Sequence, residues 1–177
     1  IIAVIVIILF FNMYGTFAYQ SNQLKPYIDF KKKINISQLF DYRDPTYGYT
    51  ISYPDFFEHE DTSLSNYQSY ARFSYTDRTN VVLESYVTKN HSSSLQTCAD
   101  SLATKLHATK TMNRDSSFLL AGPVYENGVR MKGYSHYDKF IKSGKLLFVY
   151  SLTYPDDYKP AMRSEEHTSE LQSHLNL

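Results

Sequence analysis

Hydrophobic and polar residues alternate along several stretches of this chain, and the alternation predicts β-strands. A period of two places neighbouring side chains on opposite faces of a sheet. In residues 47–54, the side chains that share one face are Tyr47, Tyr49, Ile51 and Tyr53. The other predicted strands are residues 69–76, 81–88, 117–120, 124–126, 129–141 and 145–154.

Short polar turns separate these strands and indicate antiparallel hairpins. Residues 77–80 (DRTN) form a turn between the strands 69–76 and 81–88. Asn127-Gly128 is the pair preferred in a two-residue type I′ hairpin turn, and Ser143-Gly144 offers a further turn. We therefore predict that the last two strands pair as a hairpin through Ser143-Gly144.

One stretch has the period of a helix instead. Its apolar residues recur at i, i+3, i+4, i+7 and i+11, which places them on a single stripe. Ser93 and Gln96 have the spacing of a capping box at the start of this helix. The stripe is expected to face the sheet and consists of Leu95, Cys98, Ala99, Leu102 and Leu106.

The strand at residues 145–154 is apolar on both faces, which predicts a central position with a cover on each side. Leu146 and Phe148 lie on one face, and Leu147 and Val149 lie on the other. The elements together predict an α+β fold, an antiparallel β-sheet flanked by helices (α/β/α sandwich). We expect the second cover to be a C-terminal helix that begins near Pro160 and has been lost by truncation.

The N-terminal residues 1–18 predict a signal peptide or an N-terminal membrane anchor. Residues 1–11 (IIAVIVIILFF) are an unbroken apolar run, which is the length of a signal-peptide core but shorter than the about 20 residues that span a bilayer. The chain does not begin with Met, so the start of this segment is expected to be missing. The alternative is a buried core strand, because Lys31–Lys33 follow the run closely and disfavour translocation. Residues 19–46 are interpreted as a stem or linker.

The last fifteen residues, 163–177 (RSEEHTSELQSHLNL), resemble a translated sequencing adapter. The match to the adapter extends over eleven consecutive residues, from Arg163 to Ser173. We therefore interpret residues 163–177 as an adapter-derived artefact tail and leave them out of the fold and the site. The acidic residues and histidine of this tail, Glu165, Glu166 and His167, imitate a metal or acid/base cluster and are set aside with it.

The ends of two predicted strands resemble those of a known family. Residues 49–55 (YTISYPD) and 150–156 (YSLTYPD) both end in Tyr-Pro-Asp. From about residue 47 to residue 162, the chain resembles the PsbP-like α/β/α sandwich family, in which an early and a late strand end in this way. Phe56-Phe57 stand where that family usually has Trp. The resemblance implies a single exported domain that acts as a binding or accessory subunit, and it carries no catalytic residues to transfer.

Composition narrows the possible functions. Without the tail, 17 of the 18 basic and 15 of the 18 acidic residues remain, a net charge of +2, so no nucleic-acid partner is expected. The chain has 17 Tyr and no Trp, and this use of aromatic residues favours β-structure. Cys98 is the single cysteine, which excludes a disulfide within the chain. As part of the helical stripe, it is interpreted as a small buried hydrophobe rather than a nucleophile served by His107 or His136.

The best candidate for a ligand-binding face lies on the strand at residues 129–141. The side chains that alternate onto one face there, with three from the hairpin 69–88, are Arg130, Lys132, Tyr134, His136, Arg72, Glu84 and Tyr86. Such a Tyr-rich polar face suits a sugar or an anionic partner. The alternative is an edge strand whose charges prevent edge-to-edge pairing.

A second cluster, Glu58-His59-Glu60-Asp61, offers carboxylates and an imidazole to a divalent cation. The alternative is a solvated loop. The common catalytic and nucleotide signatures are absent from the sequence, and no cofactor is expected.

We expect an extracytoplasmic protein, periplasmic or secreted, that remains membrane-anchored through residues 1–18 if they are not cleaved. Its expected function is that of a non-catalytic binding or accessory module for a protein, small-molecule or glycan partner in the envelope. Two alternatives stay open. A small extracytoplasmic enzyme predicts a deep pocket with convergent polar groups, and an oligomerising envelope protein predicts a contiguous apolar patch.

Overall fold

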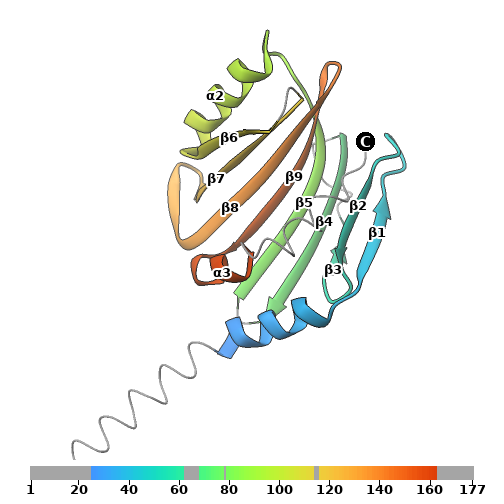
Figure 1. Cartoon of the computed structure of the whole chain (residues 1–177), viewed down its shortest axis with the longest axis vertical. Coiled ribbons are helices and arrows are strands. Elements are labelled where there is room, and N and C mark those ends of the chain that lie inside the picture. The colour runs from blue at the N-terminus through green and yellow to red at the C-terminus, as the bar shows by residue number, and fades with distance from the viewer. Residues whose placement is uncertain (1–24, 62–67, 78, 114–115, 163–177) are drawn as a thin grey trace, which may run out of the picture. The chain divides into compact units, whose positions relative to one another are not determined.

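The computed structural model describes residues 25–61, 68–77, 79–113 and 116–162 (Figure 1). The predicted signal peptide or anchor at residues 1–18 and the tail at residues 163–177 lie outside the described residues. The chain divides into two units, Ile1–Ile36 and Ser37–Leu177. In the first unit, residues 25–36 are helical, within the stretch interpreted as a stem. Among the described residues, no helix has the length and apolar character needed to cross a membrane.

The second unit is built around a seven-stranded antiparallel sheet. The two strands of its first hairpin are β4 (Gln68–Asp77) and β5 (Thr79–Lys89). The others are β3 (Glu58–Glu60), β6 (Thr109–Asn113), β7 (Ser117–Glu126), β8 (Val129–Ser143) and β9 (Leu146–Pro155). Their order across the sheet is β3-β4-β5-β9-β8-β7-β6. The antiparallel α+β fold class is thus confirmed.

Strand β9 is central, as its two apolar faces predict. It pairs with β5 on one side and with β8 on the other. The predicted hairpin through Ser143-Gly144 is confirmed, since Ser143 pairs with Leu146 and the ladder continues to Tyr134 and Pro155. Strand β8 is therefore interior, between β9 and β7, and its interpretation as an edge strand is wrong.

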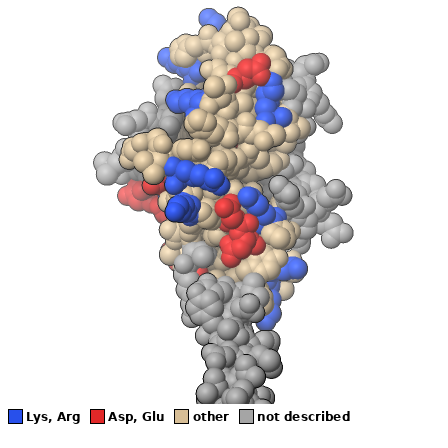
Figure 2. Space-filling view, turned by 90° about the vertical axis from the view of Figure 1, so that its left-hand side faces the viewer, with Lys and Arg blue, Asp and Glu red and all other residues tan. Residues whose placement is uncertain are grey.

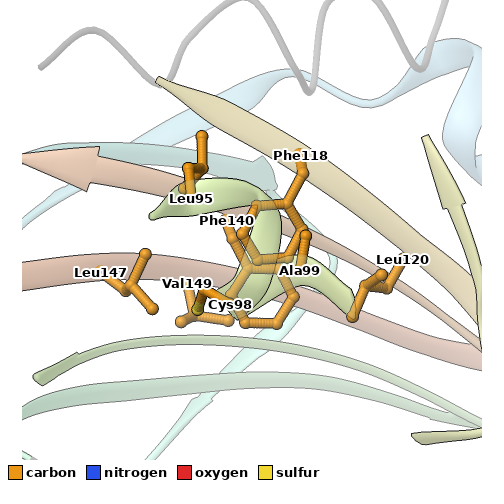
Figure 3. Close-up of a cluster of buried hydrophobic side chains, with 8 residues drawn as sticks. All are labelled: Leu95, Cys98, Ala99, Phe118, Leu120, Phe140, Leu147 and Val149. Carbon is orange, nitrogen blue, oxygen red and sulfur yellow. The ribbon is translucent and has the colours of Figure 1, made fainter. Parts of the chain in front are cut away.

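Helix α2 (Leu95–Leu106) covers one face of this sheet, which we call the α2 face. Figure 3 shows the core beneath it, where Cys98 and Ala99 of the helix lie in one cluster with the buried side chains of the sheet. Phe118 of β7 and Phe140 of β8 stack there with ring centroids 4.6 Å apart. The predicted stripe is confirmed, but the N-cap is Ser94 rather than Ser93. The Ser94 hydroxyl accepts a hydrogen bond from the Thr97 amide at 3.0 Å.

The opposite face is covered by a small second sheet of β1 (Leu39–Arg43) and β2 (Thr50–Pro54). Tyr53 of β2 stacks on Phe73 of β4 with ring centroids 4.1 Å apart. The rings of Tyr47 and Tyr49, just before β2, pack edge-on against Phe148 of β9. The expectation that only a C-terminal helix would cover this face is therefore wrong. Strand β1 falls within the stretch interpreted as a stem.

Strand β2 begins three residues later than predicted because a tight loop precedes it. One carboxylate oxygen of the buried Asp44 accepts hydrogen bonds from the amides of Thr46, at 3.1 Å, and Tyr47, at 2.6 Å. Gly48 has a φ of 73°, a left-handed conformation that favours glycine. The alternation of Tyr47 and Tyr49 with polar residues thus arises from a loop and not from a strand.

After β9 the chain turns through η1 (Asp156–Tyr158) into α3 (Lys159–Met162). The C-terminal helix was expected after residues 156–160, but α3 already begins at Lys159 within that stretch, and its Ala161 and Met162 are buried.

Candidate ligand-binding site

A row of polar side chains crosses the α2 face of the sheet beside the hydrophobic core. Residues directly opposite each other on antiparallel strands point to the same face. The register pairs Glu60 with Arg72, Arg72 with Glu84, Glu84 with Ser151 and Ser151 with Asp138. Strand pairing alone therefore brings together these five polar residues from five strands.

Arg72 on β4 is held between two carboxylates. Its Nε donates to Glu60 Oε2 at 2.9 Å and its Nη1 donates to Glu84 Oε1 at 2.8 Å. Burial opposes the charge of Arg72, but Tyr70 and the two carboxylates more than offset this, and the pKa of Arg72 is raised. The hydroxyl of Tyr70 donates to the same Glu84 oxygen. The guanidinium is fixed in position and its charge is compensated.

Tyr70 provides a pH signature of this network. Burial, followed by the hydrogen bond to Glu84, raises the pKa of Tyr70 from 10.0 to about 12. A phenol with a higher pKa in the folded state holds its proton more tightly when folded. Its contribution to stability is complete below pH 10 and is lost as the pH rises towards 12.

We expect a titration of phenolate absorbance to show a step near pH 12 that Tyr70→Phe removes, while Tyr150, whose pKa is raised by burial, still titrates late in both proteins. The variant should also lose less stability than the original chain over this pH range. Tyr125→Phe, at an exposed position, is the control and should leave the step near pH 12 in place. An unchanged step near pH 12 in Tyr70→Phe would contradict the network as described.

A pocket of about 290 Å³ opens beside this network, and we call it the Arg72 pocket. The backbone amide of Asn80 donates to the Tyr134 hydroxyl at 3.3 Å and so ties β5 to β8 at its edge. The polar residues that line the Arg72 pocket are Arg72, Asn80, Glu84, Glu126, Tyr134 and Thr153. The apolar ones are Val82, Val124 and Met131. The arrangement offers fixed hydrogen-bonding groups beside a small apolar floor.

Three of the residues predicted for the ligand face line this pocket: Arg72, Glu84 and Tyr134. Tyr86 is also on the α2 face but packs against the core under α2. His136 is buried, at 7% exposure, and is not among the residues that line the pocket.

Arg130 and Lys132 do not share the face of Tyr134, because a bulge interrupts the alternation of β8. Pro123 of β7 pairs with Ser135, but Tyr125 pairs with Arg130, so a single residue of β7 opposes four of β8. Gly133, with a φ of 80°, is one of these four. Met131 consequently lines the pocket, while Lys132 is exposed.

The charge of Arg130 acts elsewhere, on Asp156 beyond the end of β9. The hydrogen bond from Ser135 lowers the pKa of Asp156, and Lys159 and Arg130 lower it further. Arg130 therefore belongs to the β8–η1 corner rather than to the ligand face.

The cluster Glu58 to Asp61 does not converge on one point. Residues 58–60 form strand β3, whose alternation sends His59 to the face opposite Glu58 and Glu60. The His59 ring stacks on Phe73, with centroids 4.8 Å apart, and Glu60 is engaged with Arg72. Within the described part of the chain, no group of three or more His, Cys, Asp or Glu residues is placed to hold a metal ion.

A buried network that the sequence pattern did not predict lies at the other end of the polar row. His136 Nδ1 lies 2.8 Å from Asp138 Oδ2, and Ser151 Oγ donates to Asp138 Oδ1 at 2.6 Å. The remaining ring nitrogen, His136 Nε2, is buried and has no hydrogen-bond partner among the described residues. Residues 136 and 138 are two apart on a strand and so share a face, which is the signal that could have revealed the pair.

Comparison with known proteins gives the fold. The solution structure of cyanobacterial PsbP (CyanoP) from Synechocystis sp. PCC 6803 matches with a TM-score of 0.53 and 14% identity, over 80% of this chain and 94% of that one. The Saccharomyces cerevisiae Ran-binding protein Mog1p matches with a TM-score of 0.52 and 11% identity, over 78% of this chain and 93% of that one. A mutant of Mog1 matches with a TM-score of 0.53 and 13% identity, over the same shares. The chain has a PsbP-like fold. No protein-family model and no curated protein matches the sequence.

At these identities, the likeness extends to the PsbP-like fold alone, so the Arg72 pocket has to be understood from its own residues. On the side of the molecule drawn in Figure 2, acidic and basic side chains lie close to one another. A mixed surface of this kind differs from the clustered basic stripe that is typical of nucleic-acid binding.

Proposed function

We propose that this chain is an exported, non-catalytic binding or accessory module and that the Arg72 pocket holds its ligand. The apolar segment at residues 1–18 supports export. The fold supports a binding role, because one of the proteins that share it, Mog1p, is described as Ran-binding. The exported module would act in the envelope, with a glycan as the partner that best suits the pocket.

The choice of ligand rests on one observation: the charge of Arg72 is compensated by neighbouring carboxylates. Arg72 is neutralised by Glu60 and Glu84, so it offers directed hydrogen bonds without an excess positive charge. Glu126 adds a further carboxylate to the lining. An anionic ligand would meet repulsion there, whereas the hydroxyl groups of a neutral sugar can both donate and accept. Val82 and Met131 provide an apolar floor for the carbon face of the ring.

The alternative of an enzyme rests on the buried His136–Asp138 pair. An acid or base must come within hydrogen-bonding distance of its substrate, directly or through one water. His136 Nε2 is enclosed, and neither His136 nor Asp138 is among the residues that line the Arg72 pocket. The pair is better suited to holding β8 and β9 together than to acting on a substrate.

An array of neutral and acidic oligosaccharides, followed by calorimetry, tests this proposal. We expect neutral glycans to bind and Glu84→Gln to weaken the binding at least about tenfold, since a hydrogen bond to a charged group contributes about 1.5–3 kcal/mol. The same substitution removes one of the two carboxylates that pair with Arg72 and leaves only Glu60, so the repulsion of acidic glycans should decrease. Lys132→Gln, on the exposed bulge outside the pocket, should change nothing. Preference of the original chain for acidic glycans, or equal binding by Glu84→Gln, would contradict the proposal.

A further inference from the structure

A second pocket, of about 400 Å³, lies between helix α2 and the end of strand β5, and we call it the α2 groove. Its apolar lining includes Cys98 and Leu102 of the helix together with Phe140 and Leu147 of the sheet. Figure 3 shows Cys98, Phe140 and Leu147 within the core cluster, so the groove opens directly onto that core. It is separate from the Arg72 pocket, with which it shares no lining residue.

The charged residues that line the groove all carry the same sign. Lys105 in the last turn of α2 and Lys89 at the end of β5 both line it, and no Asp or Glu does. Thr88 shares the α2 face with Leu147, so Lys89 alternates away from that face and lies at the rim of the groove, whereas Lys105 belongs to the helix that forms its wall. Neither lysine forms an ion pair within the described residues. His91 adds an imidazole to the same lining. The groove thus combines an apolar floor with uncompensated positive charge.

Two acidic side chains on the elements that form the groove are engaged elsewhere. Asp100 of α2 accepts from Lys110 of β6 and from Gln96 within the helix. Glu84, two residues before Tyr86 on β5, is held by Arg72. Their charges are therefore compensated locally and do not cancel the field of the two lysines.

The loop that carries His91 is anchored by hydrogen bonds. The Asn90 amide donates to the Lys145 carbonyl at 2.8 Å, and the Asn90 side-chain oxygen accepts from the Ser92 amide at 3.0 Å. The rim is fixed by these bonds in the unliganded chain, and a preformed site loses less entropy when a ligand binds.

We propose that the α2 groove binds a small amphipathic carboxylate, with its apolar tail on the floor and its carboxylate at the positively charged rim beside Lys105. A volume of about 400 Å³ lies near the lower end of the range for small-molecule sites, about 300–1,000 Å³. It therefore fits a short acyl or aromatic carboxylate rather than a long lipid chain. This inference does not depend on the Arg72 pocket.

Calorimetry with decanoate, kept below its micelle concentration, tests the proposal. Decyltrimethylammonium is the control ligand, because it has the same tail and the opposite charge. We expect decanoate to bind, the cation to bind at least about tenfold more weakly, and added salt to weaken decanoate binding. Equal binding of the two ligands would overturn the role of the lysines, and absence of decanoate binding would overturn the site.

The variant Lys89→Gln/Lys105→Gln should weaken decanoate binding at least about tenfold, and the matched control Lys132→Gln should not. Both lysines are exposed, so the double variant is expected to fold, and a thermal melt checks this. Decanoate should also slow the reaction of Cys98 with a thiol reagent, because Cys98 lines the groove. Unchanged affinity in the double variant, or no protection of Cys98, would contradict binding in the groove.

Discussion

Replacing Phe118 with alanine is expected to destabilise the domain by about 4 kcal/mol, the middle of the range for a buried phenylalanine. Phe118 is fully buried and stacks on Phe140, with ring planes 10° apart, beneath helix α2. Its removal leaves a cavity at the contact between the helix and the sheet. Because typical domains are stable by only about 5–15 kcal/mol, this is a large share of the total.

Urea unfolding of Phe118→Ala measures this loss directly. Val129→Ala is the control, because Val129 is 70% exposed and its truncation should cost no more than about 0.5 kcal/mol. A loss below about 1.5 kcal/mol for Phe118→Ala would show that α2 does not pack on the sheet as described.

Replacing Asp138 with alanine is expected to cost about 3 kcal/mol. The carboxylate of Asp138 accepts from Ser151 and contacts His136 Nδ1, and Asp138 is only 6% exposed. Its removal leaves the imidazole with neither ring nitrogen hydrogen-bonded and the serine hydroxyl without its acceptor. Removing one partner of a buried pair typically costs about 3–5 kcal/mol, whereas replacing both with apolar residues is often close to neutral.

The double variant His136→Leu/Asp138→Leu separates this network from simple packing. It should be more stable than Asp138→Ala, because no polar group of the pair is left unsatisfied. Chemical denaturation of both variants decides the question. If the double variant is the less stable of the two, the buried pair contributes net stability and this interpretation is wrong.

Much of the sheet could be predicted because its strands alternate and its turns are short. The turn at Ser143-Gly144 also fixes the register of the hairpin that it closes. Counting back from Ser143 opposite Leu146 places Asp138 opposite Ser151. The buried network could therefore have been predicted from the sequence. The Arg72–Glu84 contact was harder to predict, because a turn at residues 77–80 allows more than one register of the two strands that it joins.

Other features depend on interactions that alternation does not encode. Strand β1 has five residues and is defined by its pairing with β2, so the pattern alone did not separate it from a stem. The loop before β2 repeats the alternation of a strand but is closed by Asp44. The bulge at Gly133 shifts the period of β8 and turns Lys132 away from the Arg72 pocket. In these cases a pairing partner, a loop hydrogen bond or extra residues determine the structure rather than the period of two.

Chemical-shift mapping of the labelled domain with the best neutral glycan from the array tests the central claim most directly. The claim is that this PsbP-like domain binds its ligand at the Arg72 pocket without transforming it. We predict that the largest amide shifts fall on Arg72, Asn80, Glu84 and Tyr134, and that the glycan signals stay intact over time. Shifts centred on the α2 groove, or steady conversion of the glycan, would contradict the claim.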